Sequence, residues 1–165
     1  MDVTIEAAEP QDVAAILAIF NREIRDGTAL WNTHERSEDE MRDWYEQRLA
    51  AGFPVLAARE GQRLLGYGSF GPFRPHDGYR HTVEHSLYIE PFAHRRGIGR
   101  AMLRTLEVEA RARGVHVMIG GSDASNAGSI ALHVSEGFTE TARLREVGRK
   151  FDRWLTLVLM QKVLT

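Results

Sequence analysis

The sequence has no cysteine and no long hydrophobic run, and each absence excludes a class of protein. Without cysteine among its 165 residues, the chain has no disulfide, no thiolate metal site and no cysteine nucleophile, as is typical of the reducing cytosol. The first residues are acidic and lack the basic and apolar blocks of a signal peptide. No apolar stretch approaches the roughly 20 residues that span a bilayer. We therefore expect a cytoplasmic protein that does not bind a membrane.

An excess of charge of either sign is also missing. The 21 Lys and Arg residues nearly balance the 23 Asp and Glu residues, which gives a net charge of −2 and an isoelectric point near 6.4. Such a chain does not attract nucleic acid through its overall field. Its 43% hydrophobic and 27% charged residues are ordinary for a globular protein. The length suits one domain, so we predict a single domain over residues 1–165.

Hydrophobic periodicity predicts a mixed α/β fold. Alternation over 3–7 predicts a strand, and helical spacing after Pro10 predicts a helix that ends at Gly27. Ser37 and Glu40 form a capping-box pattern at the start of a second helix that ends near Gly52. Further strands are predicted at 53–59, 64–70, 82–89, 115–119, 139–147 and 153–164, helices at 97–113 and 126–135, and a loop at 71–81. The order β-α-α-β-β-β-α-β-α-β-β indicates one α/β (α+β) domain with a mixed central sheet flanked by helices.

A glycine-containing turn between a strand and a helix suggests a phosphate site. It reads Arg95-Arg96-Gly97-Ile98-Gly99-Arg100. Glycines allow the backbone to approach an anion, and the N–H groups of a helix N-terminus suit phosphate oxygens. A dinucleotide fingerprint is excluded because Met102 takes the place of its third glycine, and a P-loop is excluded because no Gly-Lys-Ser/Thr follows. The alternative is an ordinary helix start with solvated arginines. The preceding strand and the arginines favour a pyrophosphate.

Two motifs carry a resemblance to the GCN5-related N-acetyltransferases (GNAT). The turn at 95–100 matches their R/Q-x-x-G-x-G/A motif for acetyl-CoA, and residues 126–138 match N-x-x-S-x-x-L-(Y/H)-x-x-x-G-F. The predicted element order also resembles the order in that superfamily, so the resemblance covers essentially the whole chain. It implies acetyl-CoA as co-substrate and N-acetyltransferase activity.

Two further segments give a narrower resemblance. Residues 79–89 resemble the Y-R-x-T-V-E-x-S-V-Y-V segment of the phosphinothricin acetyltransferases and of the related methionine sulfoximine and methionine sulfone acetyltransferases. Residues 147–154 resemble their V-G-x-K-(F/H)-x-x-W, with Phe151 where phosphinothricin enzymes of the resistance type have His. The resemblance is therefore to the methionine-derivative branch. It also implies a homodimer that completes the substrate pocket across its interface.

Glu84 and His133 are the candidate catalytic residues. Glu84 shares one face of its predicted strand with Thr82, Ser86 and Tyr88, and a carboxylate held there can accept the proton that an ammonium must lose before it attacks. The alternative for Glu84 is a salt bridge to an arginine. By resemblance, His133 occupies the position of a tyrosine acid that protonates the departing thiolate. The alternative for His133 is a structural histidine.

The resemblance also implies contacts to the co-substrate. The backbone of Leu87, Tyr88 and Ile89 would pair with pantetheine as a strand does, and an N–H there would face the thioester oxygen. Asn126 and Ser129 would contact the co-substrate, whereas their alternative role is to cap a helix.

Candidate substrate-binding residues lie in two loops and in the C-terminal segment. They are Thr28, Leu30, Trp31, Arg74, Asp77, Gly78, Tyr79, Arg80, Lys150 and Trp154. Arg74 and Arg80 suit a substrate carboxylate, and Asp77 suits an ammonium. Thr28, Leu30 and Trp31 would form a wall, and Lys150 and Trp154 would close the pocket, from the same chain or from a second subunit. The alternative for each is a solvated loop residue or a core aromatic.

No metal site is expected. His76, His81 and His85 have a spacing that suggests one, but they straddle a loop and a strand without a second ligand cluster.

We expect direct acetyl transfer in a ternary complex, since no cysteine can carry the acetyl group. The predicted substrate is the α-amine of a small amino-acid derivative, with L-methionine sulfoximine or L-methionine sulfone first and phosphinothricin second. One alternative is a protein or peptide N-terminal acetyltransferase, which needs an open groove. Another is a non-catalytic acyl-CoA-binding regulatory domain, against which Glu84 argues.

Overall fold

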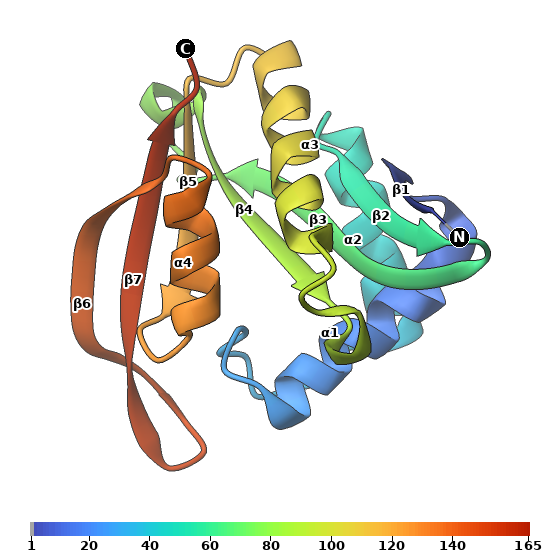
Figure 1. Cartoon of the computed structure of the whole chain (residues 1–165), viewed down its shortest axis with the longest axis horizontal. Helices are drawn as coiled ribbons and strands as arrows, with labels where there is room; N and C mark the ends of the chain where they lie inside the picture. Colours follow the sequence, from blue (N-terminus) through green and yellow to red (C-terminus); the bar gives the residue numbers. More distant parts are fainter. Residues whose placement is uncertain (1) are drawn as a thin grey trace.

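A mixed sheet of seven strands, in the order β1-β2-β3-β4-β5-β7-β6, forms the centre of the computed structural model, which describes residues 2–165. The strands are β1 (Val3–Ala7), β2 (Val55–Glu60), β3 (Arg63–Pro72), β4 (Thr82–Ile89), β5 (Val117–Asp123), β6 (Thr139–Lys150) and β7 (Arg153–Val163). All neighbours in the sheet are antiparallel except β4 and β5, which are parallel (Figure 1).

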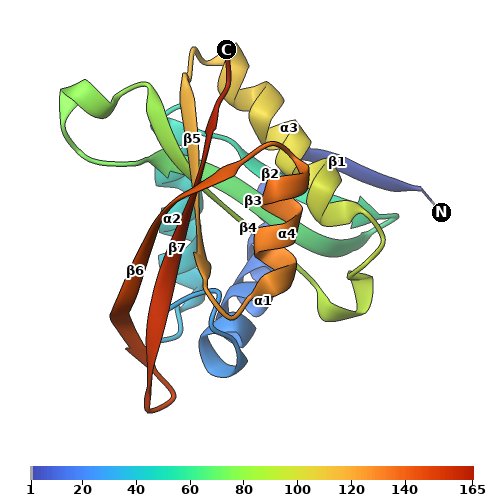
Figure 2. The same ribbon diagram turned by 60° about the vertical axis from the view of Figure 1, so that its left-hand side comes forward.

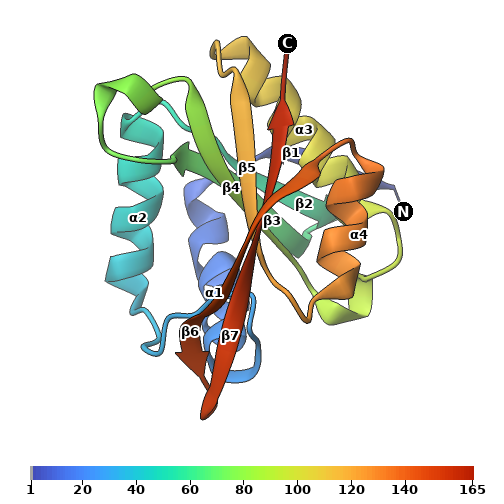
Figure 3. The same cartoon turned by 90° about the vertical axis from the view of Figure 1, so that its left-hand side faces the viewer.

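Helices cover both faces of this sheet. Helices α1 (Val13–Asp26) and α2 (Glu38–Ala50) lie on one face, and α3 (Ile98–Ala112) and α4 (Ala127–Ser135) lie on the other (Figure 3). Val55 and Ala57 of β2 belong to the core under α1 and α2, whereas Leu56 and Ala58 belong to the core under α3. Successive side chains of a strand point to opposite faces, so this strand is apolar throughout because both of its faces are buried.

The predicted element order is confirmed, and the ends of several elements differ from the prediction. The second helix has its capping box, because Ser37 Oγ accepts from the Glu40 N–H at 3.2 Å and the Glu40 carboxylate accepts from the Ser37 N–H at 2.7 Å. A 3-10 turn (Pro10–Asp12) precedes α1. Strand β5 continues four residues beyond the predicted end, because Gly120, Gly121, Ser122 and Asp123 pair with β7. Glycine, serine and aspartate have low β-propensity, so local sequence did not indicate this extension.

Strands β6 and β7 form a long hairpin that projects beyond the rest of the sheet (Figure 2). Phe151 and Asp152 make its turn with φ angles of 53° and 57°, as a two-residue turn of the favoured hairpin type requires. The hairpin carries exposed large apolar side chains at Leu144, Val147, Phe151 and Trp154.

Within residues 2–165, no helix combines the length and the apolar character that a membrane crossing needs.

Candidate active site

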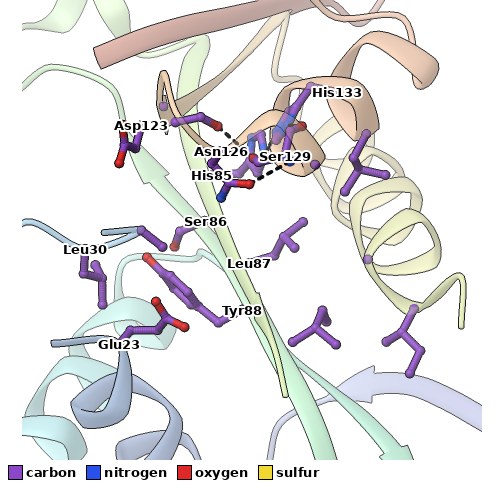
Figure 4. A pocket seen from close by; sticks show the side chains of 18 of the residues that line it. Glu23, Leu30, His85, Ser86, Leu87, Tyr88, Asp123, Asn126, Ser129 and His133 are labelled. Atoms are coloured by element: carbon purple, nitrogen blue, oxygen red, sulfur yellow. Dashed lines mark hydrogen bonds between the residues drawn. The ribbon is translucent and has the colours of Figure 1, made fainter. Parts of the chain in front are cut away.

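The two parallel strands at the centre of the sheet separate partway along their length. β4 and β5 pair only from Thr82↔Val117 to His85↔Gly120, and beyond that point β5 pairs with β7 alone. Figure 1 shows the two strands diverging. A cavity of about 1190 Å³ opens between them and is lined by β4, β5, the turn before α3, the start of α4 and the end of α1. Figure 4 shows side chains from these elements pointing into it.

The edge of β4 beyond this point offers free backbone groups to the cavity. The Glu90 N–H donates to β3 at 2.8 Å, while the ring of His94 reaches the Ile89 carbonyl from the opposite edge at 2.9 Å. Because backbone groups of a strand alternate between its two edges, Leu87 and Ile89 face the cavity and Tyr88 faces β3. An extended polar chain can therefore add to this edge at Leu87 as a strand would. The backbone contact at Tyr88 stays a prediction, since Tyr88 lines the cavity while alternation directs its backbone groups to β3.

The turn before α3 has the geometry of an anion site. Gly97 is the N-cap of α3 with a φ of 78°, a left-handed conformation that favours glycine. The first residues of the helix, Ile98, Gly99 and Arg100, line the cavity, and their N–H groups have no partner within the helix. Arg100 also forms an ion pair with a glutamate of α4's C-terminus at 2.8 Å.

The two other arginines of this turn differ in their pairing. Arg96 is bound to Glu60 at 2.5 Å. Arg95 lines the cavity and forms no ion pair within the described part of the chain. Arg95 is therefore the arginine of this turn with its full hydrogen-bonding capacity available to a phosphate.

Asn126 and Ser129 both take part in the cap of α4 and both line the cavity, so the capping role and the ligand-binding role considered for them are compatible. Asn126 Oδ1 caps α4 by accepting from the Ser129 N–H at 3.0 Å, and Ser129 Oγ shares a hydrogen bond with Ser122 Oγ at 2.8 Å. Both residues also line the cavity. Free strand-edge groups at one end and a glycine-rich helix N-terminus at the other fit a ligand with an extended amide chain and a diphosphate.

Glu84 presents its carboxylate to the cavity from the face of β4 that α1 and α2 cover. Tyr88 on the same face packs into the core under those helices, whereas Leu87 and Ile89 pack into the other core, which confirms the predicted division of faces. Within residues 2–165 Glu84 forms no hydrogen bond or ion pair, so the salt-bridge alternative is not observed. Burial raises the pKa of Glu84, and the charge of Arg74 partly opposes this effect.

His133 is one half of a buried histidine pair. Its Nδ1 lies 2.7 Å from the carbonyl of Ser129, and its Nε2 lies 2.9 Å from Nε2 of His85. The carbonyl can only accept, so Nδ1 of His133 donates and Nε2 accepts from His85. This assignment leaves Nδ1 of neutral His85 without a proton, and Nδ1 has no hydrogen-bond partner within the described residues. Burial lowers the pKa of His133 and lowers that of His85 to about 3. Neutral His133 offers no N–H to the cavity, which favours the structural role over that of an acid.

The loop after α1 forms the wall opposite β4. Thr28 and Leu30 line the cavity as predicted, and Figure 4 shows Leu30 beside Glu23 and Tyr88. Trp31 does not line it. Its indole packs on Gly148 of β6, where a Cβ would collide with the ring, and its Nε1 donates to the Thr28 carbonyl at 2.8 Å.

Lys150 does not line the cavity of its own chain. Its Nζ donates to the carbonyls of Glu23, Gly27 and Leu30 at 3.2, 2.7 and 2.6 Å. An ammonium has three protons, and all of them are used. Burial lowers the pKa of Lys150. The side chain therefore fixes the shape of the loop that forms the cavity wall.

Residues 73–81 of the predicted loop lie apart from the main cavity, whereas Gly71 and Pro72 line it. Arg74, Asp77, Tyr79 and Arg80 line a separate hollow of about 240 Å³, and Gly78 faces open space. The Arg74 guanidinium stacks over the Phe73 ring at 5.1 Å, and the Arg80 guanidinium turns back to the Asp77 carbonyl at 3.5 Å. The expectation that these residues line the acceptor pocket is not met within one chain. Trp154 is 59% exposed and packs under Arg149, also away from the cavity.

Three charged residues of the cavity wall were missed by sequence reasoning: Glu23, Arg48 and Asp123. Arg48 follows Met41, Trp44 and Tyr45 at helical spacing, so the pattern of its helix could have placed it toward the sheet. Asp123 lies in the part of β5 for which local sequence gave no signal.

The three histidines considered as metal ligands do not converge. His81 contacts the Gly114 carbonyl at 3.2 Å, His85 contacts His133, and His76 lies beside Tyr79. Residues 2–165 contain no cluster of three or more histidine, aspartate and glutamate side chains suited to a metal ion.

Comparisons with known proteins agree with this geometry. The model of the acetyltransferase (GNAT) family matches residues 16–138. The L-methionine sulfoximine/L-methionine sulfone acetyltransferase of Salmonella typhimurium is 46% identical over 96% of this chain and 93% of its own. The phosphinothricin N-acetyltransferase of Alcaligenes faecalis is 37% identical over 98% of this chain and 82% of its own. The structure of yncA from Salmonella typhimurium, solved with its cofactor acetyl-CoA, superimposes with a TM-score of 0.96 at 45% identity, covering 99% of this chain and 94% of that one. The chain is an N-acetyltransferase and belongs to the acetyltransferase (GNAT) family.

Proposed function

We propose that the chain transfers the acetyl group of acetyl-CoA to the α-amine of a small amino-acid derivative. L-Methionine sulfoximine and L-methionine sulfone are the favoured substrates, with phosphinothricin as a lesser one, in agreement with the names of the relatives. The observation that carries the proposal is the free Glu84 carboxylate at the point where β4 leaves β5. A base placed there lies beside the strand edge that suits a pantetheine chain.

The residues of the cavity have separate roles in this reaction. Acetyl-CoA, when bound, supplies the acetyl group. The N–H groups at the start of α3 and the Arg95 guanidinium bind its diphosphate, and Leu87 hydrogen-bonds to its amide chain. Glu84 accepts the proton of the substrate ammonium, directly or through a water, so that the amine can attack. Transfer is direct because the chain has no cysteine. The CoA thiolate leaves without an acid from the protein.

We also propose that the enzyme works as a homodimer in the cytoplasm. The exposed apolar side chains of the β6–β7 hairpin, Leu144, Val147, Phe151 and Trp154, support this, because large apolar residues gathered on one projecting element favour a protein contact. Sedimentation of the wild-type chain and of Trp154→Glu tests it. We expect a dimer for the wild type and a monomer for the variant.

Replacing the proposed base tests the catalytic site. Glu84→Gln keeps the shape of the side chain and removes its basicity, so kcat for methionine sulfone at pH 7 should fall by about 10²-fold or more. Raising the pH should restore part of the activity, since the amine then loses its proton without help. Glu46→Gln, on the exposed surface of α2, is the matched control and should keep wild-type activity. A Glu84→Gln enzyme with wild-type rates between pH 6 and 9 would refute the assignment.

A further inference from the structure

Arg48 is a cation of the cavity wall without an anion. It extends from α2 to the end of β3, where its guanidinium occupies the space that a Cβ at Gly71 would fill. The guanidinium also lies 5.4 Å from the Trp44 ring and lines the main cavity. Within residues 2–165 it forms no hydrogen bond and no ion pair, although the side chain is half-buried. Burial lowers its pKa, but an arginine remains charged at neutral pH.

Two other partly buried arginines of this protein have an acidic partner, whereas Arg36 stacks over the Phe20 ring at 4.2 Å. Arg22 binds Glu90 at 2.6 Å, and Arg59 binds Asp12. Holding a charge in a partly desolvated position is unfavourable unless an anion offsets it. The unpaired guanidinium of Arg48, turned toward the cavity, is therefore suited to an anion that arrives with the substrate.

The position of Arg48 relative to Glu84 indicates which anion. Gly71 on β3 is directly opposite Glu84 on β4. The Cβ positions of such a pair lie about 4.5–5.5 Å apart on the same face of the sheet. The guanidinium at the Gly71 position and the side chain of Glu84 thus lie on the same face of the sheet and line one cavity, with a Glu84 carboxylate oxygen turned toward Gly121 of β5. An α-amino acid carries the complementary pair, a carboxylate and an ammonium on one carbon.

We propose that Arg48 binds the α-carboxylate of the substrate and thereby directs its α-amine to Glu84. This inference rests on the proposed function. A guanidinium can hold a carboxylate through two parallel hydrogen bonds, which fixes its orientation as well as its position. Arg48 then makes a free carboxylate a requirement, and a peptide, whose first residue ends in an amide, lacks it. Gly71 has a part in this role, since any side chain at position 71 would displace the guanidinium.

The test compares L-methionine sulfone with its carboxamide, which keeps the α-amine and loses the negative charge. For the wild type we expect kcat/KM to favour the acid by about 10-fold or more, since the carboxamide leaves the guanidinium without an anionic partner. Arg48→Met keeps an apolar stem, and it should lower kcat/KM for the acid by a similar factor while changing that of the carboxamide little. Arg48→Lys should give an intermediate ratio. Arg42→Met, on the exposed surface of the same helix, should behave as the wild type.

Calorimetric titration with acetyl-CoA checks that each variant is folded, and the affinity should stay within about twofold of the wild type. Arg48→Met with an unchanged preference for the acid would overturn the inference and leave the proposed function intact. If Arg48→Met kept the preference for the acid and Arg74→Met lost it, the carboxylate site would lie in the 71–81 loop. A wild-type protein that acetylates neither compound would overturn the proposed function, and the inference with it.

Discussion

Glu84 combines two properties that suit a general base, an uncommitted carboxylate and a raised pKa. No partner stabilises its ionised form by a direct contact within the described residues, and burial disfavours that form. Sequence reasoning could identify Glu84, because alternation along a strand fixes the face of a side chain. It could not establish whether the carboxylate is paired, because that depends on residues from other elements.

The pH dependence of the reaction should reflect this environment. Because only ionised Glu84 can accept a proton, kcat/KM should fall on the acid side with an apparent pKa above 4.5, the ordinary value for glutamate. The charge of Arg74 lowers the pKa of Glu84, so Arg74→Met should move this acid limb to higher pH. Rates measured from pH 5 to 8 with saturating acetyl-CoA test both statements. An acid limb that is unchanged in Arg74→Met would show that the two charges do not interact.

At the scale of the element, the turn before α3 should control the affinity for acetyl-CoA. A Cβ at Gly99 would lie 3.3 Å from the side chain of Leu132 on α4, so a larger residue there enters the narrow space between the two helices. Gly99→Val should therefore weaken acetyl-CoA binding at least tenfold, as its side chain hinders close approach of the diphosphate to the backbone.

Calorimetric titration measures this loss, and the melting temperature shows whether the variant is folded. Gly99→Ala, with a smaller side chain, should give a smaller loss. Unchanged affinity in folded Gly99→Val would refute the assignment of this turn.

Lys150, at the end of β6, holds the loop after α1 that forms the cavity wall opposite β4. Lys150→Met leaves three carbonyls of the loop after α1 without their common donor. Leaving buried polar groups unpaired costs about 1–3 kcal/mol each at most sites, so the melting temperature should fall by several degrees. The loop should also lose its fixed shape, and KM for methionine sulfone should rise more than the Kd for acetyl-CoA. Equal changes in both constants would show that Lys150 supports the whole fold and not this wall.

At the scale of the whole molecule, the sequence predicts the order of elements better than the contacts between elements. Periodicity, capping residues and two motifs were sufficient for the fold and for the acetyl-CoA side, since those signals are local. The contacts of Lys150 and Trp31 could not be predicted, because their partners lie more than a hundred residues away in the chain. Arg48 was missed because its placement depends on a contact with Gly71 on another element, β3.

The buried histidine pair should make stability depend on pH. The folded protein does not protonate His85 until about pH 3, whereas an unfolded chain does so near 6.5. The unfolded state therefore binds more protons between these values, and the free energy of unfolding should fall as the pH decreases from 6.5. Each such site contributes at most about 1.4 kcal/mol per pH unit. His85→Gln keeps a donor for His133 without titrating, and urea unfolding from pH 4 to 7 should show a shallower slope for it. An identical slope would mean that His85 binds protons alike in the folded and unfolded states.

The most direct measurement is kcat/KM for five compounds under one condition: methionine sulfone, methionine sulfoximine, phosphinothricin, methionine and a peptide that begins with methionine. Thiol release from acetyl-CoA follows each reaction. We expect the sulfone and the sulfoximine to rank first. Methionine should rank about 10- to 100-fold lower, since it lacks the oxygen that a polar group of the cavity can bind. The peptide should rank lowest, since it has no free carboxylate beside its amine. A peptide in first place would contradict the small-molecule function, and phosphinothricin in first place would assign the enzyme to the other branch of its relatives.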